Sequence, residues 1–137
     1  MSDETQQLSA CRVVNAVRAA FLQEAASVDD AVVKDGFVVE DAPFIWLERF
    51  SQLTTNAIKS GDFGKAKAHL TLISCLVEAG DPHTERCIDV AYVESLMWDI
   101  KDDKLKNEGW RVIPENLKKL YVAMWGRQPF MENPGES

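Results

Sequence analysis

Residues 60–82, SGDFGKAKAHLTLISCLVEAGDP, decide the fold class. The stretch begins and ends on the same pattern, because Gly61-Asp62 and Gly80-Asp81 stand 19 residues apart. Glycine is favoured just past the end of a helix, and aspartate is favoured as the cap of the next one. Apolar side chains recur between them every three or four residues, at Phe63, Ala66, Leu70, Ile73 and Val77. The pattern predicts a helix bounded by tight turns, with antiparallel neighbours.

Helical periodicity continues on both sides of this stretch. We expect one helix over residues 5–26 and another from Pro43 to Gly61 before it. We expect a helix over residues 82–100 after it, then a charged, helix-compatible link over 101–109 and a last helix from Pro114 to Gly126. The predicted fold class is therefore all-α, a bundle of about five helices. Leu70 and Val93 are expected in its core.

Residues 31–39 allow two interpretations. The runs Ala31-Val32-Val33 and Phe37-Val38-Val39 flank Asp35-Gly36, and this arrangement is typical of a small β-hairpin. The alternative is an irregular connection whose valines fill the core. The sequence leaves both open.

Composition restricts the class of protein. The chain has 137 residues, a formal net charge of −7 and 46% apolar residues. These values fit one folded domain, which we place at residues 1–126, followed by a mobile tail at 127–137. The longest run without charged residues, 68–77, is half the length of about 20 residues that a membrane-spanning helix needs. We expect no membrane association, and no nucleic-acid binding because clustered basic residues are missing.

The cellular compartment is predicted from the first residues and from the cysteines. The N-terminus is acidic and polar, unlike a signal peptide. The three cysteines are an odd number and lack paired spacing. We therefore expect a reduced, cytoplasmic protein.

Candidate catalytic and metal-binding residues are few. His69, Cys75, His83 and Cys87 are ligand-type residues in one region, but only His83 and Cys87 have paired spacing. Cys75 stands between leucines and is expected to be a small core residue. Glu94 lies on an apolar stripe, where an ion pair is a better interpretation than a catalytic acid. No phosphate-binding glycine loop or nucleophile motif occurs, so we predict no enzymatic activity, no metal and no cofactor.

Charge is distributed unevenly along the chain. Residues 24–48 hold seven acids and one base, whereas residues 109–127 hold four bases and one acid. An acidic surface can simply keep a protein in solution, or it can attract a basic protein partner. The second interpretation predicts a partner-binding site at Asp29, Asp30, Asp35, Glu40, Asp41 and Glu48. The tryptophans at 46, 98, 110 and 125 are expected in the core, with Trp125 the most exposed.

Two resemblances extend this interpretation. Residues 57–70, around Gly61-Asp62-Phe63, resemble the turn of tetratricopeptide-type helical hairpins. Residues 60–62, 87–98 and 114–126 resemble a family of small bacterial proteins of unassigned function, similar to the immunity proteins encoded beside secreted polymorphic toxins. That resemblance implies an immunity protein that covers the active site of a cognate toxin. The alternative is a helical-hairpin adaptor that binds a partner protein or peptide.

Overall fold

The computed structural model describes residues 2–131, and the side chains of residues 4–131. Every regular element in this part of the chain is helical, so the all-α prediction is confirmed. The seven α-helices there are α1 Ser2–Ala20, α2 Leu22–Lys34, α3 Pro43–Lys59, α4 Phe63–Ala79, α5 Pro82–Ile88, α6 Asp103–Val112 and α7 Glu115–Trp125. The shorter elements are η1 Val39–Asp41, the π-helical turn η2 Asp89–Val93, and η3 Pro129–Met131.

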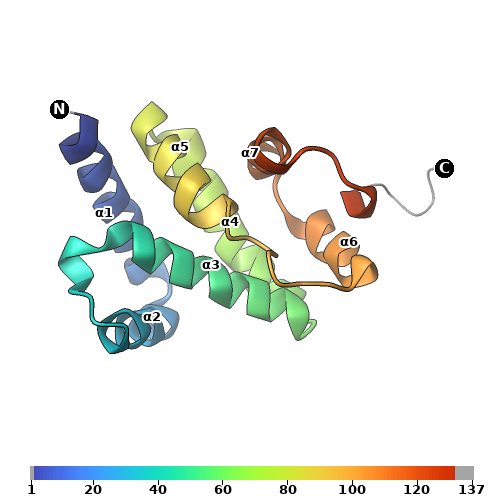
Figure 1. Ribbon diagram of the computed structural model, residues 1–137, viewed down its shortest axis with the longest axis horizontal. Helices are drawn as coiled ribbons and strands as arrows, with labels where there is room; N and C mark the ends of the chain where they lie inside the picture. The colour runs from blue at the N-terminus through green and yellow to red at the C-terminus, as the bar shows by residue number, and fades with distance from the viewer. Residues whose placement is uncertain (1, 132–137) are drawn as a thin grey trace.

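Helix α3 lies at the centre of the bundle. It packs against α1, α2, α4, α6 and η2, and Figure 1 shows it crossing between the α1–α2 end and the α6–α7 end of the molecule. Its side chains Trp46, Leu47 and Phe50 have no exposed surface. Leu70 on α4 and Val93 in η2 are equally buried, which confirms their predicted place in the core.

The predicted β-hairpin is wrong, because α2 continues through its first strand. Asp35 caps the C-terminus of α2, and Gly36 follows with a φ of 92°. The Gly36 N–H donates to Val33 O at 2.9 Å, and the Phe37 N–H donates to Val32 O at 3.2 Å. These two bonds define a Schellman motif, which needs a left-handed residue just as a hairpin turn does. The Asp-Gly pair therefore ends a helix here. The first predicted helix is also divided, between Ala20 and Leu22.

The predicted turns on either side of α4 are confirmed. Gly61 ends α3 with a second Schellman motif, in which the Gly61 N–H donates to Ile58 O and the Asp62 N–H donates to Ala57 O. Asp62 caps α4 by accepting from the Lys65 N–H, and Asp81 caps α5 by accepting from the Thr84 N–H at 2.9 Å. The tetratricopeptide-like hairpins are not supported. The helix after the second Gly-Asp turn, α5, has only 7 residues, whereas α3 and α4 have 17 each, so the helix-and-turn unit does not repeat.

The helix predicted over residues 82–100 is interrupted, and α3 supplies the physical reason. Ser51 Oγ donates to Tyr92 O at 2.7 Å, and the Met97 N–H donates to Thr55 Oγ1 at 2.9 Å. In a continuous α-helix, the Tyr92 carbonyl and the Met97 N–H would both form hydrogen bonds within the helix itself. The chain instead passes through η2 into a series of turns, and Met97 adopts a φ of 59°. Trp98 follows this left-handed residue at the surface.

Residues 127–131 follow the predicted domain boundary and lie on the helical body. The Phe130 ring meets the Trp110 ring edge-on at 5.9 Å and the Tyr121 ring at 6.3 Å. The rest of the predicted tail, 132–137, lies outside the described residues. No helix within residues 2–131 is long and apolar enough to cross a membrane.

Candidate functional site

Asp29, the first acid of the predicted site, forms part of the structural framework. Its carboxylate receives two bonds from the Arg18 guanidinium, at 2.5 and 2.9 Å, and one from the Trp46 indole N–H at 2.8 Å. The hydrogen bond from Arg18 holds the pKa of Asp29 below its usual value, against the opposing effect of burial. Asp29 thus links α1, α2 and α3, and much of its charge is already compensated.

Asp35 is compensated in a similar way. It forms an ion pair with Arg49 on α3, and both side chains remain largely exposed. The pair connects the C-terminal cap of α2 to the outer face of α3. The Asp35 side chain is 38% exposed, compared with 29% for Asp29.

Asp30, Glu40, Asp41 and Glu48 are exposed. Glu40 raises the pKa of Arg18 through its charge, behind the larger effect of the Asp29 hydrogen bond. It lines a pocket of about 380 Å³ together with Arg18 and Asp29. The main-chain oxygen of Asp41 accepts from Gln7 Nε2 at 3.3 Å. Glu40 and Asp41 therefore lie beside α1, whereas Glu48 lies on α3.

Glu48 belongs to a different group of acids. Burial raises the pKa of Glu48, and the charge of Glu94 raises it further. Burial also raises the pKa of Asp89, with added contributions from Glu85 and Glu94. One Asp89 carboxylate oxygen is buried without a hydrogen-bond partner among the described residues. Glu94 therefore repels both Glu48 and Asp89, and we term these three residues the acidic cluster.

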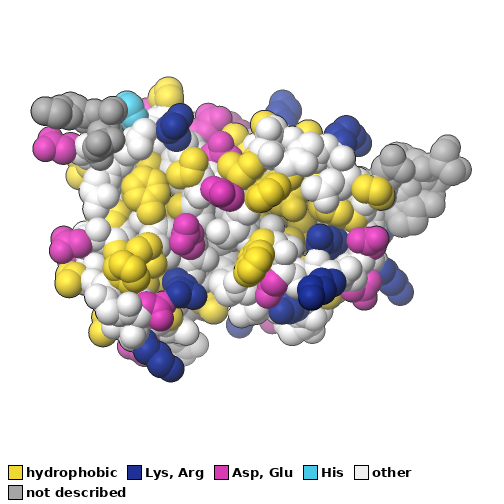
Figure 2. All heavy atoms as spheres, viewed as in Figure 1, with side chains coloured by type: hydrophobic (Ala, Val, Ile, Leu, Met, Phe, Trp, Pro, Cys, Tyr) yellow, Lys and Arg dark blue, Asp and Glu magenta, His cyan; other side chains and the backbone are white. Residues whose placement is uncertain are grey.

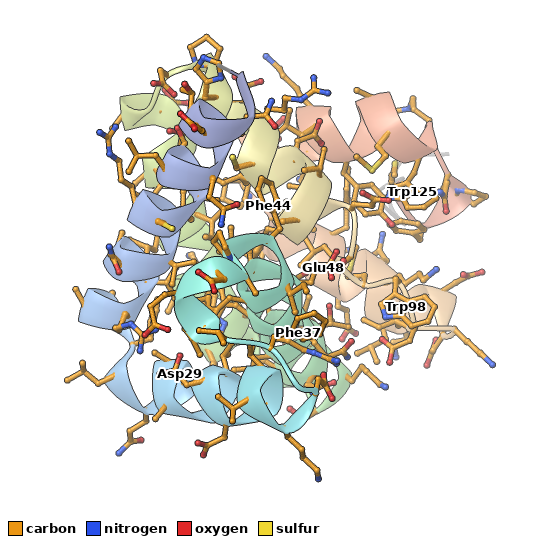
Figure 3. All side chains as sticks on the ribbon, turned by 60° about the vertical axis from the view of Figure 1, so that its left-hand side comes forward. Asp29, Phe37, Phe44, Glu48, Trp98 and Trp125 are labelled. Atoms are coloured by element: carbon orange, nitrogen blue, oxygen red, sulfur yellow. The ribbon has the colours of Figure 1, made fainter. Side chains whose placement is uncertain are left out.

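Large apolar side chains are exposed near this cluster. Trp98 is 69% exposed, Trp125 48% and Phe37 44%, so the prediction of a buried Trp98 is wrong. Figure 3 shows Phe37, Phe44 and Glu48 on the side turned toward the viewer, with Trp98 and Trp125 at its right-hand edge. Figure 2 shows apolar and acidic side chains alternating across the middle of the molecule. We term the surface formed by Phe37, Phe44, Glu48, Glu94, Trp98 and Trp125 the acid–aromatic face.

A pocket of about 310 Å³ lies at one end of this face, between the two exposed tryptophans. Trp98 comes from the turns after η2, and Trp125 is the last residue of α7. Glu94 and Tyr121 also line the pocket, as does Lys106. The Lys106 ammonium lies 5.3 Å from the centre of the Phe130 ring, in a cation–π contact. The Trp98 indole N–H donates to Gln52 Oε1 at 3.4 Å.

A second pocket, of about 460 Å³, lies along α7, and the charged residues that line it are mainly basic. Lys118, Lys119 and Arg127 line it together with Trp110. The Lys118 ammonium lies 3.7 Å from Glu115 and 5.4 Å from the centre of the Trp110 ring. The basic segment predicted near the C-terminus therefore lines a surface on α7, separate from the acidic cluster.

The candidate metal ligands are not brought together. His69 is fully buried, and its Nδ1 lies 3.0 Å from Thr54 Oγ1. Cys75 is exposed on α4, so the prediction that it fills the core is wrong. Cys87 is buried, its Sγ donates to Gln6 O, and burial raises its pKa, which disfavours the reactive thiolate. Within residues 2–131, no three His, Cys, Asp or Glu side chains are grouped to hold a metal ion.

The comparison with known families places the chain. Residues 15–126 match the family described as a domain of unknown function, DUF7674. The chain belongs to this family. The match extends from the middle of α1 to the residue after α7, and nothing in it links the chain to the immunity proteins of toxin systems. No curated protein and no solved structure matches the chain.

None of the four aromatic residues of the acid–aromatic face belongs to the site that the sequence predicts. The sequence leaves Phe37 either in a hairpin strand or in an irregular connection, and it places Trp98 in the core as part of a long helix. The exposure of Trp98 depends on Ser51 and Thr55 of another helix, and no local sequence pattern reveals it.

Proposed function

We propose that this chain is a non-enzymatic binding protein, and that it docks a basic protein partner on the acid–aromatic face. The observation that carries the proposal is the position of Trp98 and Trp125, exposed on either side of one pocket and next to the acidic cluster. Tryptophans are enriched among the residues that dominate the energy of protein interfaces. A partner that covers both indoles would remove their apolar surface from water.

Charge supports the same type of partner. The charge of Glu94 raises the pKa of Glu48 and of Asp89, so an approaching positive charge would relieve this repulsion. The formal net charge of −7 adds a long-range attraction toward basic proteins. Such attraction mainly increases the association rate and weakens as salt is added.

We further propose that the partner is a toxin, and that the chain is a cytoplasmic immunity protein that covers the toxin's active site. The resemblance of residues 87–98 and 114–126 to immunity-like proteins motivates this proposal. Cells that express the toxin from a neighbouring gene should survive when this chain is co-expressed. They should lose protection when it carries Trp98→Ala and Trp125→Ala. Full protection by that variant would contradict the proposed surface.

The adaptor interpretation remains the second candidate, because the exposed indoles also suit a partner peptide or helix. The two candidates differ in what the partner does when it is free. A partner that kills cells in the absence of this chain supports immunity. A harmless partner that binds with the same dependence on Trp98 supports an adaptor.

The docking proposal is tested by affinity capture from the native host with three tagged proteins. The parent and a Leu22→Ala control should retain the same basic partner, identified by mass spectrometry. Leu22 is a suitable control because it is an apolar side chain with 72% exposure, on α2. The Trp98→Ala/Trp125→Ala variant should lose that partner. Equal recovery with all three proteins would reject the acid–aromatic face as the docking surface.

A further inference from the structure

The pocket between Trp98 and Trp125 has a composition suited to a cation. Two indoles and the Tyr121 ring contribute aromatic surface, and Glu94 contributes a carboxylate. Aromatic faces attract cations electrostatically, most strongly in the case of tryptophan. A carboxylate beside them supplies a counter-charge and a hydrogen-bond acceptor.

The resident cation, Lys106, does not fill this role. Its ammonium is held over the Phe130 ring at 5.3 Å, and Phe130 itself is buried against Trp110 and Tyr121. No ion pair of Lys106 with Glu94 is present in the described part of the chain. Glu94 is exposed and acts on both Glu48 and Asp89 through its charge. Lys106 therefore leaves the Glu94 carboxylate without an ion pair among the described residues.

The residue types that line the pocket suit a guanidinium better than an ammonium. A guanidinium is planar, so it stacks on an indole face while its N–H groups pair with a carboxylate in a bidentate arrangement. It is also more weakly hydrated than an ammonium, which lowers the cost of entering an aromatic pocket. Both kinds of group, indoles and a carboxylate, line this pocket.

We propose that the pocket between Trp98 and Trp125 receives an arginine side chain of the docked partner, with Glu94 as the counter-ion. This inference rests on the proposed function, because it assigns a contact within the same docking surface. It names the partner's chemistry: an exposed arginine at the centre of a basic surface. The indoles then act as walls of a specific subsite in addition to their role as apolar contact area.

The subsite can be tested with a small probe and no protein partner. The probe is N-acetyl-arginine amide, and the matched control is the uncharged citrulline compound of nearly the same shape. The chain has four tryptophans, so its indole N–H groups give four signals in a ¹H–¹⁵N correlation spectrum. The signals of Trp98 and Trp125 should shift with the arginine probe and saturate at about 10–100 mM, because one cation–π contact and one ion pair bind weakly. Those of Trp46 and Trp110 should stay in place.

Substitution of the counter-ion completes the test. Glu94→Gln should weaken binding of the arginine probe at least about threefold, as expected for the loss of one partly exposed ion pair. Glu4→Gln, an exposed glutamate on α1, should leave the affinity unchanged. Equal shifts with the citrulline compound, no shift at Trp98 and Trp125, or unchanged affinity in Glu94→Gln would each overturn the arginine assignment.

Failure of this inference is distinguishable from failure of the docking proposal. If the arginine probe does not bind but Trp98→Ala/Trp125→Ala still abolishes capture of the partner, docking stands and the arginine assignment is wrong. If the probe binds as expected but no partner depends on the two indoles, the subsite is supported and the docking proposal is wrong.

Discussion

The carboxylate of Asp29 accepts the indole N–H of Trp46 at 2.8 Å. The same carboxylate binds Arg18, whose guanidinium carbon lies 5.6 Å from the centre of the Trp46 ring. Trp46 has no exposed surface, so its N–H depends on this acceptor. An acid that the charge pattern assigns to a partner surface therefore satisfies a buried donor on α3.

Asp29→Asn should lower the free energy of unfolding by about 1–3 kcal/mol, since it removes the charge from bonds to both Arg18 and Trp46. Urea unfolding at neutral pH measures this. Asp30→Asn is the matched control, because Asp30 is the exposed neighbour on the same helix, and it should change stability by less than about 0.5 kcal/mol. Equal stability of the two variants would contradict a structural role for Asp29.

His69 should make stability depend on pH. Burial lowers its pKa from 6.5 to about 4, and its ring packs against Phe21 and Phe50. The unfolded chain therefore binds a proton at His69 between these values while the folded chain does not, so stability falls as pH drops from about 6.5 to 4. The slope contributed by His69 can approach about 1.4 kcal/mol per pH unit.

The pH effect is measured by chemical denaturation at several pH values from 7 to 4. His69→Gln should flatten the profile over that range. His83→Gln, at the chain's other histidine, should leave the slope unchanged. If His83→Gln removes the slope and His69→Gln preserves it, the assignment of the pH dependence to His69 is wrong.

Two glycines should respond in opposite directions to alanine. Gly36 has a φ of 92°, and a methyl group added there would meet no other atom within 4 Å, so Gly36→Ala should cost about 1–2 kcal/mol through backbone strain alone. Gly64 lies in the first turn of α4, where an added methyl meets only Asp62 Oδ1 at 3.9 Å. Gly64→Ala should be neutral or stabilising by up to about 1 kcal/mol. Thermal unfolding of both variants tests the helix end at Gly36, and equal effects would argue against it.

The cysteines should differ in reactivity. Cys75 is exposed, Cys11 is partly exposed, and Cys87 is buried with a raised pKa. Iodoacetamide added to the folded protein should label Cys75 first, and Cys87 should react only after denaturant is added. Mass spectrometry of tryptic peptides over time measures the order. Early labelling of Cys87 would show that α5 does not pack on α1 as described.

Some of the fold is predictable because its determinants are local. The boundaries of α4 follow from Gly61-Asp62 and Gly80-Asp81, where the capping residues contact backbone groups within a few positions. The burial of Leu70 follows from helical periodicity. These features need no information from distant parts of the chain.

The remaining differences arise from chemistry that a sequence pattern leaves ambiguous. A glycine after an aspartate serves a hairpin turn or a helix C-terminus equally well, and the hydrogen bonds of Gly36 and Phe37 decide for the helix. The end of the helix after Val93 depends on Ser51 and Thr55, about 40 residues earlier in the chain, as shown by separations of 41 and 42 positions. Periodicity cannot contain that information.

The candidate site is predictable only in part for the same reason. The acid-rich sequence draws attention to Glu48, which is exposed and interacts with Glu94 through its charge. It cannot distinguish Glu48 from Asp29, because compensation by Arg18 and Trp46 is a property of the folded chain. Nor can it place Trp98 at the surface, since its exposure follows from the interruption of the helix.

The most direct test of the docking proposal is the association rate with the captured partner, measured by stopped-flow at low and physiological salt. Glu48→Gln/Glu94→Gln should slow association about tenfold or more at low salt, and the difference should shrink as salt is added. Glu4→Gln should associate at the parent rate. If Asp30→Asn/Glu40→Gln/Asp41→Asn slows association while Glu48→Gln/Glu94→Gln does not, the partner binds near η1 and the acid–aromatic face is not its docking surface.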